Sequence, residues 1–291
     1  MLPVAVLVLV TAVWGITFVQ IKDALELYPL FAFLAVRFAI ALVVLAVPAA
    51  RRLRSLGRDG VVAGTLLGGL LAGGYALQTA GLDRTTVSAA GFVTGMYVIL
   101  TPVFGFALFG MRIARAVWLG VALSVSGLAM LSGVSAGSVT GDLMVLAGAA
   151  LYALQIVLME RFAPRYDPLA FTTAQMAAAF VGFAVVAAAV GQVERPHGRT
   201  VWAALLVTGI FASAFAFLVQ AWAQRRTSAT QTALIFALEP VWAGIFGYAL
   251  AGDRLGAIGW AGCAVILAGI AVSEPAAART LARLVRVRRA D

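Results

Sequence analysis

Ten apolar segments, each long enough to cross a lipid bilayer, follow one another along almost the whole chain. Their approximate bounds are 2–21, 30–48, 60–81, 87–109, 116–134, 141–159, 168–190, 201–222, 229–250 and 255–273. A helix rises about 1.5 Å per residue, so about 20 residues span a hydrocarbon core of about 30 Å. The connections between the segments are short, which favours antiparallel neighbours. The sequence therefore predicts an all-α membrane protein with ten transmembrane helices.

The composition excludes a soluble protein of this size. Of the 291 residues, 63% are hydrophobic and only 11% are charged, whereas soluble domains carry about 25% charged residues. The net charge of +9 does not indicate nucleic-acid binding, because the arginines form short clusters between apolar segments and do not share one polar face. Membrane lipid is the expected surrounding, and no nucleic-acid partner is expected.

The placement of positive charge predicts the topology. Fifteen of the 21 lysine and arginine residues lie in segments that would share one side with both termini, five lie on the other side, and Arg37 lies within a helix. Because basic residues concentrate in cytoplasmic loops, both termini are expected in the cytoplasm. The excess of Ala, Gly, Val and Arg indicates a bacterial genome, hence a bacterial inner membrane. The basic tail, 274–291, is expected to be cytoplasmic, either as a simple anchor or as an amphipathic helix on anionic lipid.

No pattern in the sequence indicates an enzyme. The sole cysteine, Cys263, lies within an apolar segment, and the sequence contains neither a metal-binding H-E-x-x-H motif nor a phosphate-binding P-loop. One string, 133–137, matches Gly-x-Ser-x-Gly, and the only histidine is His197. That motif requires a turn from a strand into a helix, but here it follows an apolar helix. We therefore expect no catalytic residue, no metal site and no cofactor.

The chain contains an internal repeat. A shift of 142 residues aligns segments three to five with segments eight to ten, without gaps. The aligned identities include Gln78 with Gln220, Trp118 with Trp260, Gly120 with Gly262, and Gly127 with Gly269. A unit of five helices is odd, so the second copy enters the membrane from the opposite side. The sequence thus predicts two inverted repeats, 1–134 and 135–273, with a central cavity between them.

Two prolines interrupt the correspondence between the halves. Pro102 and Pro240 each lie in the second half of a predicted helix, but they are four residues out of register at the offset of 142. Proline removes a backbone hydrogen bond and kinks a helix. We expect the two halves to bend at depths that differ by about one turn, and the two prolines to serve the two gates.

Several short motifs together resemble the drug/metabolite transporter superfamily, specifically its EamA type with two repeats. These motifs are Trp14-Gly15, Arg37-Phe38, Thr101-Pro102, Gln175-Met176, Glu239-Pro240 and Gly252-Asp253. The sequence Gly110-Met111-Arg112 departs from the Gly-Glu that the family commonly has at that place. The resemblance implies a basket-like fold of ten helices and export of small metabolites. Some members, the YddG type, export aromatic amino acids.

Two charged residues lie deep within predicted helices. Glu239 is about eleven residues into its segment and Arg37 about seven into its own. A charge at such depth costs about 2.5–3.5 kcal/mol, so each side chain is expected to face the bundle interior or water. Glu239 is a candidate site for proton coupling or for a substrate amine. Alternatively, it caps the kinked backbone or pairs with Arg37.

Polar and aromatic residues recur at helical spacing and indicate the wall of the cavity. A wall of aromatic side chains with a few amides and hydroxyls suits an apolar ligand with a polar head. Alternatively, the aromatic side chains only fill helix contacts. The predicted substrate-binding residues are Trp14, Phe18, Tyr75, Gln78, Thr94, Tyr97, Tyr152, Gln155, Phe217, Gln220, Phe236 and Glu239. The same stripes also contain Thr11, Thr101, Ser213 and Thr232, and Gly64 and Gly68 form a pattern that permits close helix approach.

The sequence therefore predicts a secondary transporter that exports small metabolites by alternating access. Neutral or zwitterionic amino acids, including aromatic ones, are the expected substrates, and protons are candidate coupling ions. An exporter of cationic drugs or quaternary ammonium compounds is the first alternative, because one deep carboxylate in an aromatic cavity also suits a cation. A membrane receptor or assembly protein that transports nothing is the second.

Overall fold

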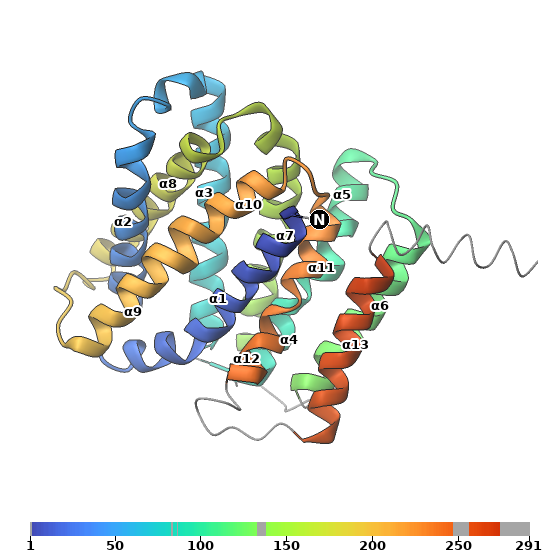
Figure 1. Ribbon diagram of the computed structural model, residues 1–291. Helices are drawn as coiled ribbons and strands as arrows, with labels where there is room; N and C mark the ends of the chain where they lie inside the picture. Colours follow the sequence, from blue (N-terminus) through green and yellow to red (C-terminus); the bar gives the residue numbers. More distant parts are fainter. Residues whose placement is uncertain (1, 83, 86, 133–137, 247–255, 274–291) are drawn as a thin grey trace, which may run out of the picture.

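The computed structural model describes residues 2–82, 84–85, 87–132, 138–246 and 256–273, and within them all ten predicted segments are helical (Figure 1). The first half contains α1 (Leu2–Leu25), α2 (Leu30–Ala49), the short 3-10 helix η1 (Leu53–Leu56), α3 (Gly57–Leu82), α4 (Val87–Gly95), α5 (Tyr97–Phe109) and α6 (Arg115–Ser132). The second half contains α7 (Val139–Phe162), the 3-10 helix η2 (Ala163–Arg165), α8 (Pro168–Ala189), α9 (Arg199–Gly209), the π-helical segment η3 (Ile210–Phe215), α10 (Ala216–Ala223), α11 (Ala229–Phe236), α12 (Glu239–Phe246) and α13 (Ala257–Ser273). The string 133–137, the Gly252-Asp253 motif and the tail 274–291 lie outside the described residues.

Five of these helical segments meet the length and hydropathy of a membrane span without interruption. They are Leu30–Ala49, Leu53–Leu82, Val139–Arg165, Pro168–Ala189 and Arg199–Ala223. Four of the other predicted segments contain shorter apolar helical stretches, Leu2–Thr17, Val93–Phe109, Arg115–Met130 and Ala257–Ser273. The ninth segment is divided between the short helices α11 and α12. The expected all-α membrane fold is thus confirmed.

The fourth and ninth segments are broken at equivalent positions. α4 ends at Gly95 and α5 begins at Tyr97, while α11 ends at Phe236 and α12 begins at Glu239. At the offset of 142, Tyr97 corresponds to Glu239. The expectation that the halves bend at different depths is therefore wrong for these breaks.

The two prolines occupy different places relative to the break. Pro240 lies in the first turn of α12, where a missing N–H costs no helical hydrogen bond. Pro102 lies inside α5, and the helix continues past it to Phe109. The shift of four residues between the two prolines therefore changes how α12 begins compared with α5. It does not change where α4 and α11 end.

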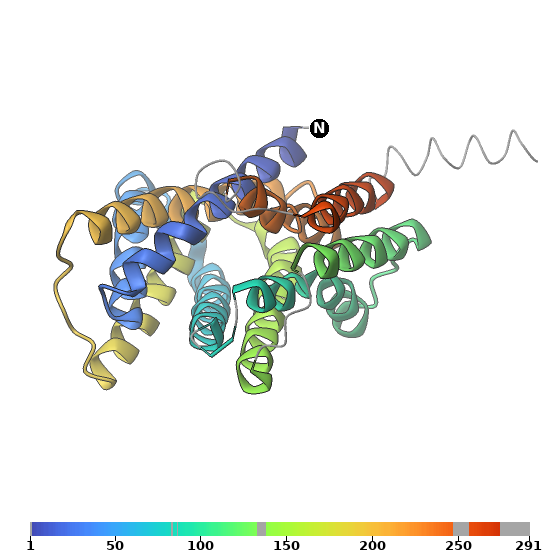
Figure 2. The same cartoon turned by 90° about the horizontal axis from the view of Figure 1, so that it is seen from below.

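The crossing of α6 and α13 demonstrates the inversion of the repeats. A Cβ added to Gly120 would lie 2.6 Å from the carbonyl oxygen of Gly269, and one added to Gly127 would lie 2.6 Å from that of Gly262. At the offset of 142, Gly120 corresponds to Gly262 and Gly127 to Gly269, so each contact is the repeat equivalent of the other. Residue numbers rise along α6 as they fall along α13, so the equivalent helices run antiparallel, side by side in Figure 2. Inverted repeats are thus confirmed.

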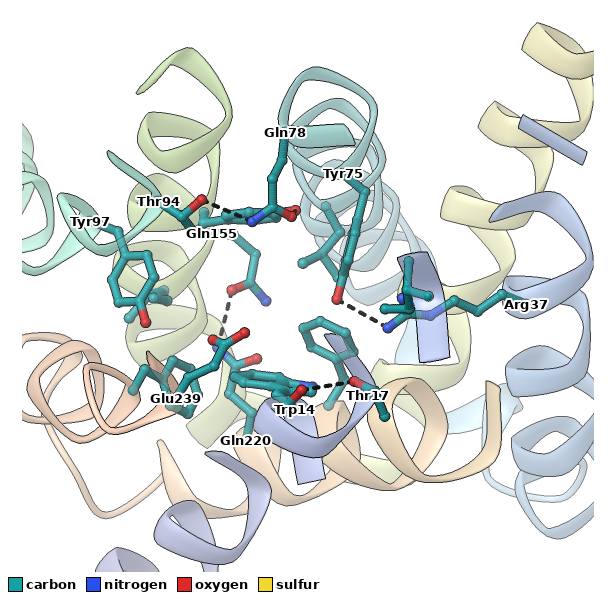
Figure 3. A pocket seen from close by; sticks show the side chains of 16 residues that line it. Trp14, Thr17, Arg37, Tyr75, Gln78, Thr94, Tyr97, Gln155, Gln220 and Glu239 are labelled. Carbon is teal, nitrogen blue, oxygen red and sulfur yellow. Dashed lines mark hydrogen bonds between the residues drawn. The ribbon is translucent and has the colours of Figure 1, made fainter. Parts of the chain in front are cut away.

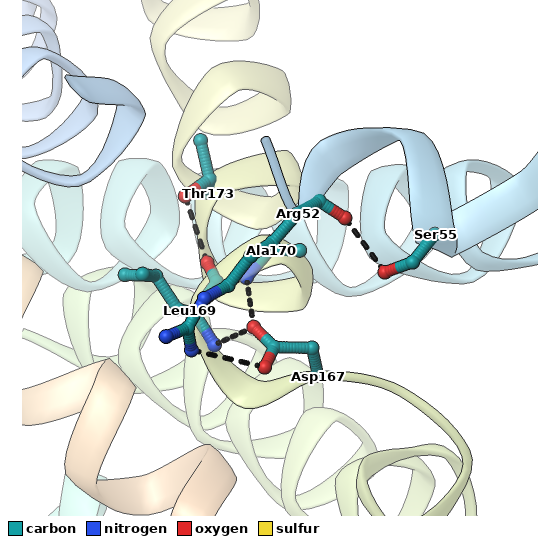
Figure 4. A network of polar contacts seen from close by, with 6 residues as sticks. All are labelled: Arg52, Ser55, Asp167, Leu169, Ala170 and Thr173. Atoms are coloured by element: carbon teal, nitrogen blue, oxygen red, sulfur yellow. Dashed lines mark hydrogen bonds and ion pairs between the residues drawn. The ribbon is translucent and has the colours of Figure 1, made fainter. Parts of the chain in front are cut away.

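The pair formed by α2 and α8 is antiparallel in the same way. At one end Arg52 Nη1 lies 3.2 Å from Asp167 Oδ2, and Asp167 also caps the first turn of α8 (Figure 4). Midway the rings of Phe38 and Phe183 are 5.2 Å apart. At the other end the backbone N–H of Phe31 donates to the Gln192 side chain at 2.9 Å.

Close helix contact at glycines joins the two halves. A Cβ on Gly68 would lie 2.3 Å from the carbonyl oxygen of Gln175, and one on Gly64 would lie 2.7 Å from the Ala174 Cβ. The spacing of these two glycines therefore serves helix packing, as the small-residue pattern predicts. α3 of the first half packs along α8 of the second through this surface.

The eighth segment is not a regular helix, which the sequence does not predict. η3 is a π-helical insertion between α9 and α10, and the equivalent part of the first half is regular α3. π-helical turns are rare and are frequent at functional sites. Ser213, within η3, corresponds to Leu71 at the offset of 142. The insertion therefore introduces a difference between otherwise equivalent helices.

Candidate functional site

A cavity of about 690 Å³, counting its part open to solvent, lies between the two repeats. Helices of both halves contribute to it, as expected for a site between inverted repeats. Its lining residues are Trp14, Thr17, Ile21, Arg37, Leu71, Tyr75, Gln78, Thr94, Tyr97, Tyr152, Gln155, Ile156, Phe217, Gln220, Phe236 and Glu239 (Figure 3).

Eleven of the twelve residues predicted to bind substrate line this one cavity. The side chain of the twelfth, Phe18, lies outside the described side chains. The stripe residues Thr11, Thr101 and Thr232 are fully buried but do not line the cavity. The structure thus brings the predicted set together, and the binding role of these residues stays a prediction.

The sequence prediction missed part of the wall on α1. Trp14, Thr17 and Ile21 line the cavity, and their spacing of three and four residues is helical. The predicted stripe contained Thr11, Trp14 and Phe18 and left out Thr17 and Ile21. Thr17 lies three positions after Trp14, so helical spacing alone would have placed its hydroxyl on the same face.

One wall is a hydrogen-bonded group on α3, α4 and α7. The Tyr152 hydroxyl donates to Gln78 Oε1 at 3.0 Å, and Gln78 Nε2 donates to Thr94 Oγ1 at 3.0 Å. The rings of Tyr152 and Tyr75 meet edge to face, 5.4 Å apart. The two hydrogen bonds hold the polar ends of three side chains at the cavity surface.

Arg37 forms a second wall from α2. Its side chain is only 3% exposed. Nε donates to Ser213 Oγ at 2.8 Å, and Nη2 donates to the Tyr75 hydroxyl at 3.3 Å. The guanidinium carbon lies 4.9 Å from the centre of the Tyr75 ring. Within the described residues the only ion pair is Arg52–Asp167, so Arg37 does not pair with Glu239 there.

A third wall is aromatic. The ring of Trp14 lies 4.8 Å from that of Phe236, edge to face, and 5.9 Å from that of Phe217. Trp14 Nε1 donates to the carbonyl oxygen of Ala212, within η3, at 2.9 Å. The π-helical segment thus positions the indole and, through Ser213, the guanidinium of Arg37.

A chain of hydrogen-bonded, buried glutamines extends from the lining residues Gln155 and Gln220 into the protein interior. Gln220 Nε2 donates to Gln155 Oε1 at 3.0 Å and to Gln224 Oε1 at 2.8 Å. Gln155 Nε2 lies 3.4 Å from Gln175 Oε1. Gln220 Oε1 is buried and has no hydrogen-bond partner in the described part of the chain. An unpaired buried acceptor of this kind is energetically costly.

Glu239 is the first residue of α12 and faces the cavity opposite Arg37 (Figure 3). A carboxylate at a helix N-terminus is stabilised by the partial positive charge of the first N–H groups. No hydrogen bond or ion pair of its carboxylate is found within the described ranges. Tyr97, its equivalent in the first half, lies beside it at the start of α5.

One end of the bundle carries most of the arginines of the connections. We call this the arginine-rich end; it comprises the connections 50–56, 110–114, 163–167 and 224–228. Here α5 packs against α11, whereas the equivalent pair, α12 and α4, makes at most marginal contact within the described residues. Glu160 accepts the N–H of Ala229, the first residue of α11, at 2.7 Å.

At the other end, two hydrogen bonds tie connections to neighbouring parts of the chain. The Tyr28 hydroxyl donates to the backbone oxygen of Glu194 at 2.6 Å, and Thr85 donates to Asp142 at 2.6 Å. Burial, and then the charge of Glu194, raise the pKa of Tyr28, so its hydroxyl keeps the proton that it donates. Within the described residues, α5 thus packs more extensively against α11 than α12 does against α4.

Comparison with known proteins agrees with this architecture. The model of the EamA-like transporter family matches residues 1–133 and 139–273. An uncharacterized transporter of Archaeoglobus fulgidus is 31% identical over 269 residues, which cover 91% of this chain and 83% of that protein. Human solute carrier family 35 member F6 is 27% identical over 105 residues, 32% of this chain and 28% of that protein. One crystal structure, 22% identical, aligns with a TM-score of 0.78 over 95% of this chain and 98% of its own.

Proposed function

Because the chain belongs to the EamA-like transporter family and is a multi-pass membrane transporter, we propose that it exports small neutral or zwitterionic metabolites by alternating access. Amino acids with an aromatic or apolar side chain are the proposed substrates. The single observation that carries this proposal is the cavity between the inverted repeats, which has Arg37 on one wall and Glu239 on the opposite one.

The difference between the two ends of the bundle supports alternating access. The halves are related by inversion, so the packing of α5 on α11 has a counterpart in α12 on α4. Exchange of these two packings would alternate which end gives access to a fixed central site. The helix breaks at Met96 and at Ala237–Leu238 are where each half-helix can change direction.

The lining of the cavity supports the substrate class. Aromatic rings of Trp14, Phe217 and Phe236 offer an apolar surface, while amides and hydroxyls occupy the opposite wall. A zwitterion places an ammonium and a carboxylate on one small molecule, which matches a cavity that presents both a carboxylate and a guanidinium. An exporter of cationic compounds, the alternative, is supported by Glu239 and the aromatic wall but not by Arg37.

The charge distribution supports an orientation with both termini in the cytoplasm of a bacterium, in its inner membrane. The arginine-rich end then faces the cytoplasm. Protons are the proposed coupling ions, with Glu239 as their site. One proton taken up by Glu239 outside is released inside, and the free carboxylate then binds the ammonium group of one substrate molecule that leaves.

Flux in proteoliposomes tests the proposed function. Purified protein is expected to accelerate the movement of labelled phenylalanine at least tenfold over protein-free vesicles, and an inward pH gradient is expected to drive it uphill. A panel of other amino acids, tetraphenylphosphonium and ethidium separates the alternatives. Flux of the two cations alone would contradict the substrate class, and folded protein that moves no compound would contradict the carrier function.

A further inference from the structure

Arg37 is a buried guanidinium that has no anionic partner within the described ranges. It is 3% exposed, in the middle of α2, and the groups that contact it are a serine hydroxyl, a tyrosine hydroxyl and two aromatic rings. These neutral groups replace hydrogen bonds that water would make to the guanidinium, but they do not neutralise its positive charge. A charge buried in this way normally faces a partner or a functional cavity. Arg37 lines the cavity.

The donors of Arg37 are divided between the protein and the cavity. A guanidinium has five N–H donors in a planar fork. Ser213 takes the one on Nε, and Tyr75 takes one of the two on Nη2. The described residues accept neither donor of Nη1 nor the second donor of Nη2. The outer edge of the fork, formed by one N–H of Nη1 and one of Nη2, can bind a carboxylate through two parallel hydrogen bonds.

Tyr75 adds a further donor at the same place. Its hydroxyl oxygen accepts from Arg37, and within the described residues its hydrogen has no acceptor. A carboxylate held by the outer edge of Arg37 would be such an acceptor. Arg37 and Tyr75 thus form one positively charged corner with donors that face the cavity.

This corner exists in only one of the two halves. Gln175 occupies in α8 the place that Arg37 has in α2, and the offset of 142 replaces Ser213 with Leu71 and Tyr75 with Phe217. The η3 insertion, which also lacks a counterpart, holds Ser213 against Arg37. Departures of this kind from an internal pattern are expected at functional sites.

We infer that Arg37, positioned by Ser213 and assisted by Tyr75, is the subsite for a substrate carboxylate. The transported compounds are therefore carboxylates with an apolar body, α-amino acids among them, and amines without a carboxylate are poor substrates. This inference rests on the proposed function and gives the substrate a fixed orientation, with its carboxylate toward α2 and its ammonium group toward Glu239.

Three related probes test the carboxylate subsite by equilibrium binding to the purified protein. Phenylalanine has both charged groups, 3-phenylpropionate lacks the ammonium, and phenethylamine lacks the carboxylate. The wild-type protein is expected to bind phenethylamine about 10- to 100-fold more weakly than phenylalanine, the usual effect of losing a charged hydrogen-bonded pair. Phenylpropionate keeps the carboxylate, so it is expected to keep the contribution of Arg37 to the binding affinity.

Variants assign that preference to Arg37. Arg37→Gln is expected to weaken phenylalanine and phenylpropionate about 10- to 100-fold and to leave phenethylamine unchanged. Arg37→Lys keeps the charge and is expected to restore part of the affinity, because the fork geometry is lost. Arg52→Gln, which removes an arginine from the surface pair with Asp167, is the matched control and is expected to bind like the wild type. Ser213→Ala and Tyr75→Phe provide milder changes if Arg37→Gln does not fold.

The outcomes separate this inference from the proposed function. A wild-type protein that binds phenethylamine as well as phenylalanine would overturn the carboxylate subsite, while transport of either would leave the carrier function intact. An equal loss for all three probes in folded Arg37→Gln would also overturn it, because Arg37 would then only maintain the shape of the cavity. Folded protein that neither binds nor moves any probe would overturn both.

Discussion

Gly68→Ala is expected to destabilise the protein by about 1–3 kcal/mol, the usual cost of overpacking a close contact. The new Cβ would lie 2.3 Å from the carbonyl oxygen of Gln175 and 2.8 Å from the Ala178 Cβ. A backbone oxygen cannot rotate away, so α3 and α8 must move apart. The measurement is the thermal unfolding midpoint of the purified protein in detergent, which should fall clearly.

The neighbouring residue provides the control for this prediction. A Cβ on Gly69 meets nothing within 4 Å, so Gly69→Ala changes only helix propensity, which favours alanine by about 1 kcal/mol. Its midpoint is expected to stay the same or to rise. Equal midpoints for the two variants would show that α3 and α8 are not in the close contact described.

Glu239→Gln is expected to abolish uphill transport driven by a pH gradient. Glutamine keeps the size and the hydrogen-bonding capacity of the side chain but cannot exchange a proton. With one proton exchanged per substrate, one pH unit supplies about 1.4 kcal/mol, enough for about a tenfold substrate gradient. In the variant this gradient is expected to fall to unity at every pH. The measurement is accumulation of labelled phenylalanine in proteoliposomes with an imposed pH gradient.

A second glutamate controls for the loss of charge. Glu194 lies in the exposed connection between α8 and α9, and Glu194→Gln is expected to leave accumulation unchanged. Unaltered pH-driven accumulation in Glu239→Gln would remove Glu239 from the coupling. Loss of accumulation in both variants would point to a general effect of negative charge.

The sequence predicted the architecture because the bilayer and the repeat constrain it strongly. The length of each apolar segment follows from the thickness of the hydrocarbon core. The odd number of helices in a unit requires inversion, which Gly120 against Gly269 and Gly127 against Gly262 make visible. Most of the cavity wall was also predictable, because helical spacing places Tyr75 with Gln78 and Tyr152 with Gln155 on one face.

The remaining features depend on contacts between distant segments. The bond of Arg37 to Ser213 joins residues 176 positions apart, and it requires a π-helical insertion that no local signal in Ile210–Phe215 announces. The helix breaks were assigned to the prolines, although they lie at equivalent positions set by the repeat. Thr101 and Thr232 fit their stripes, but each is fully buried in the same helix as a lining residue, Tyr97 or Phe236, and does not reach the cavity itself.

Access to the cavity from the two sides of the membrane tests the central claim most directly. The sole cysteine, Cys263, is buried, so Cys263→Ala combined with Thr94→Cys places a single thiol at the cavity wall. In vesicles of opposite orientation, a membrane-impermeant maleimide is expected to label this thiol from both sides, and phenylalanine is expected to protect it from both. Labelling from one side only, with and without substrate and at every pH gradient, would contradict alternating access.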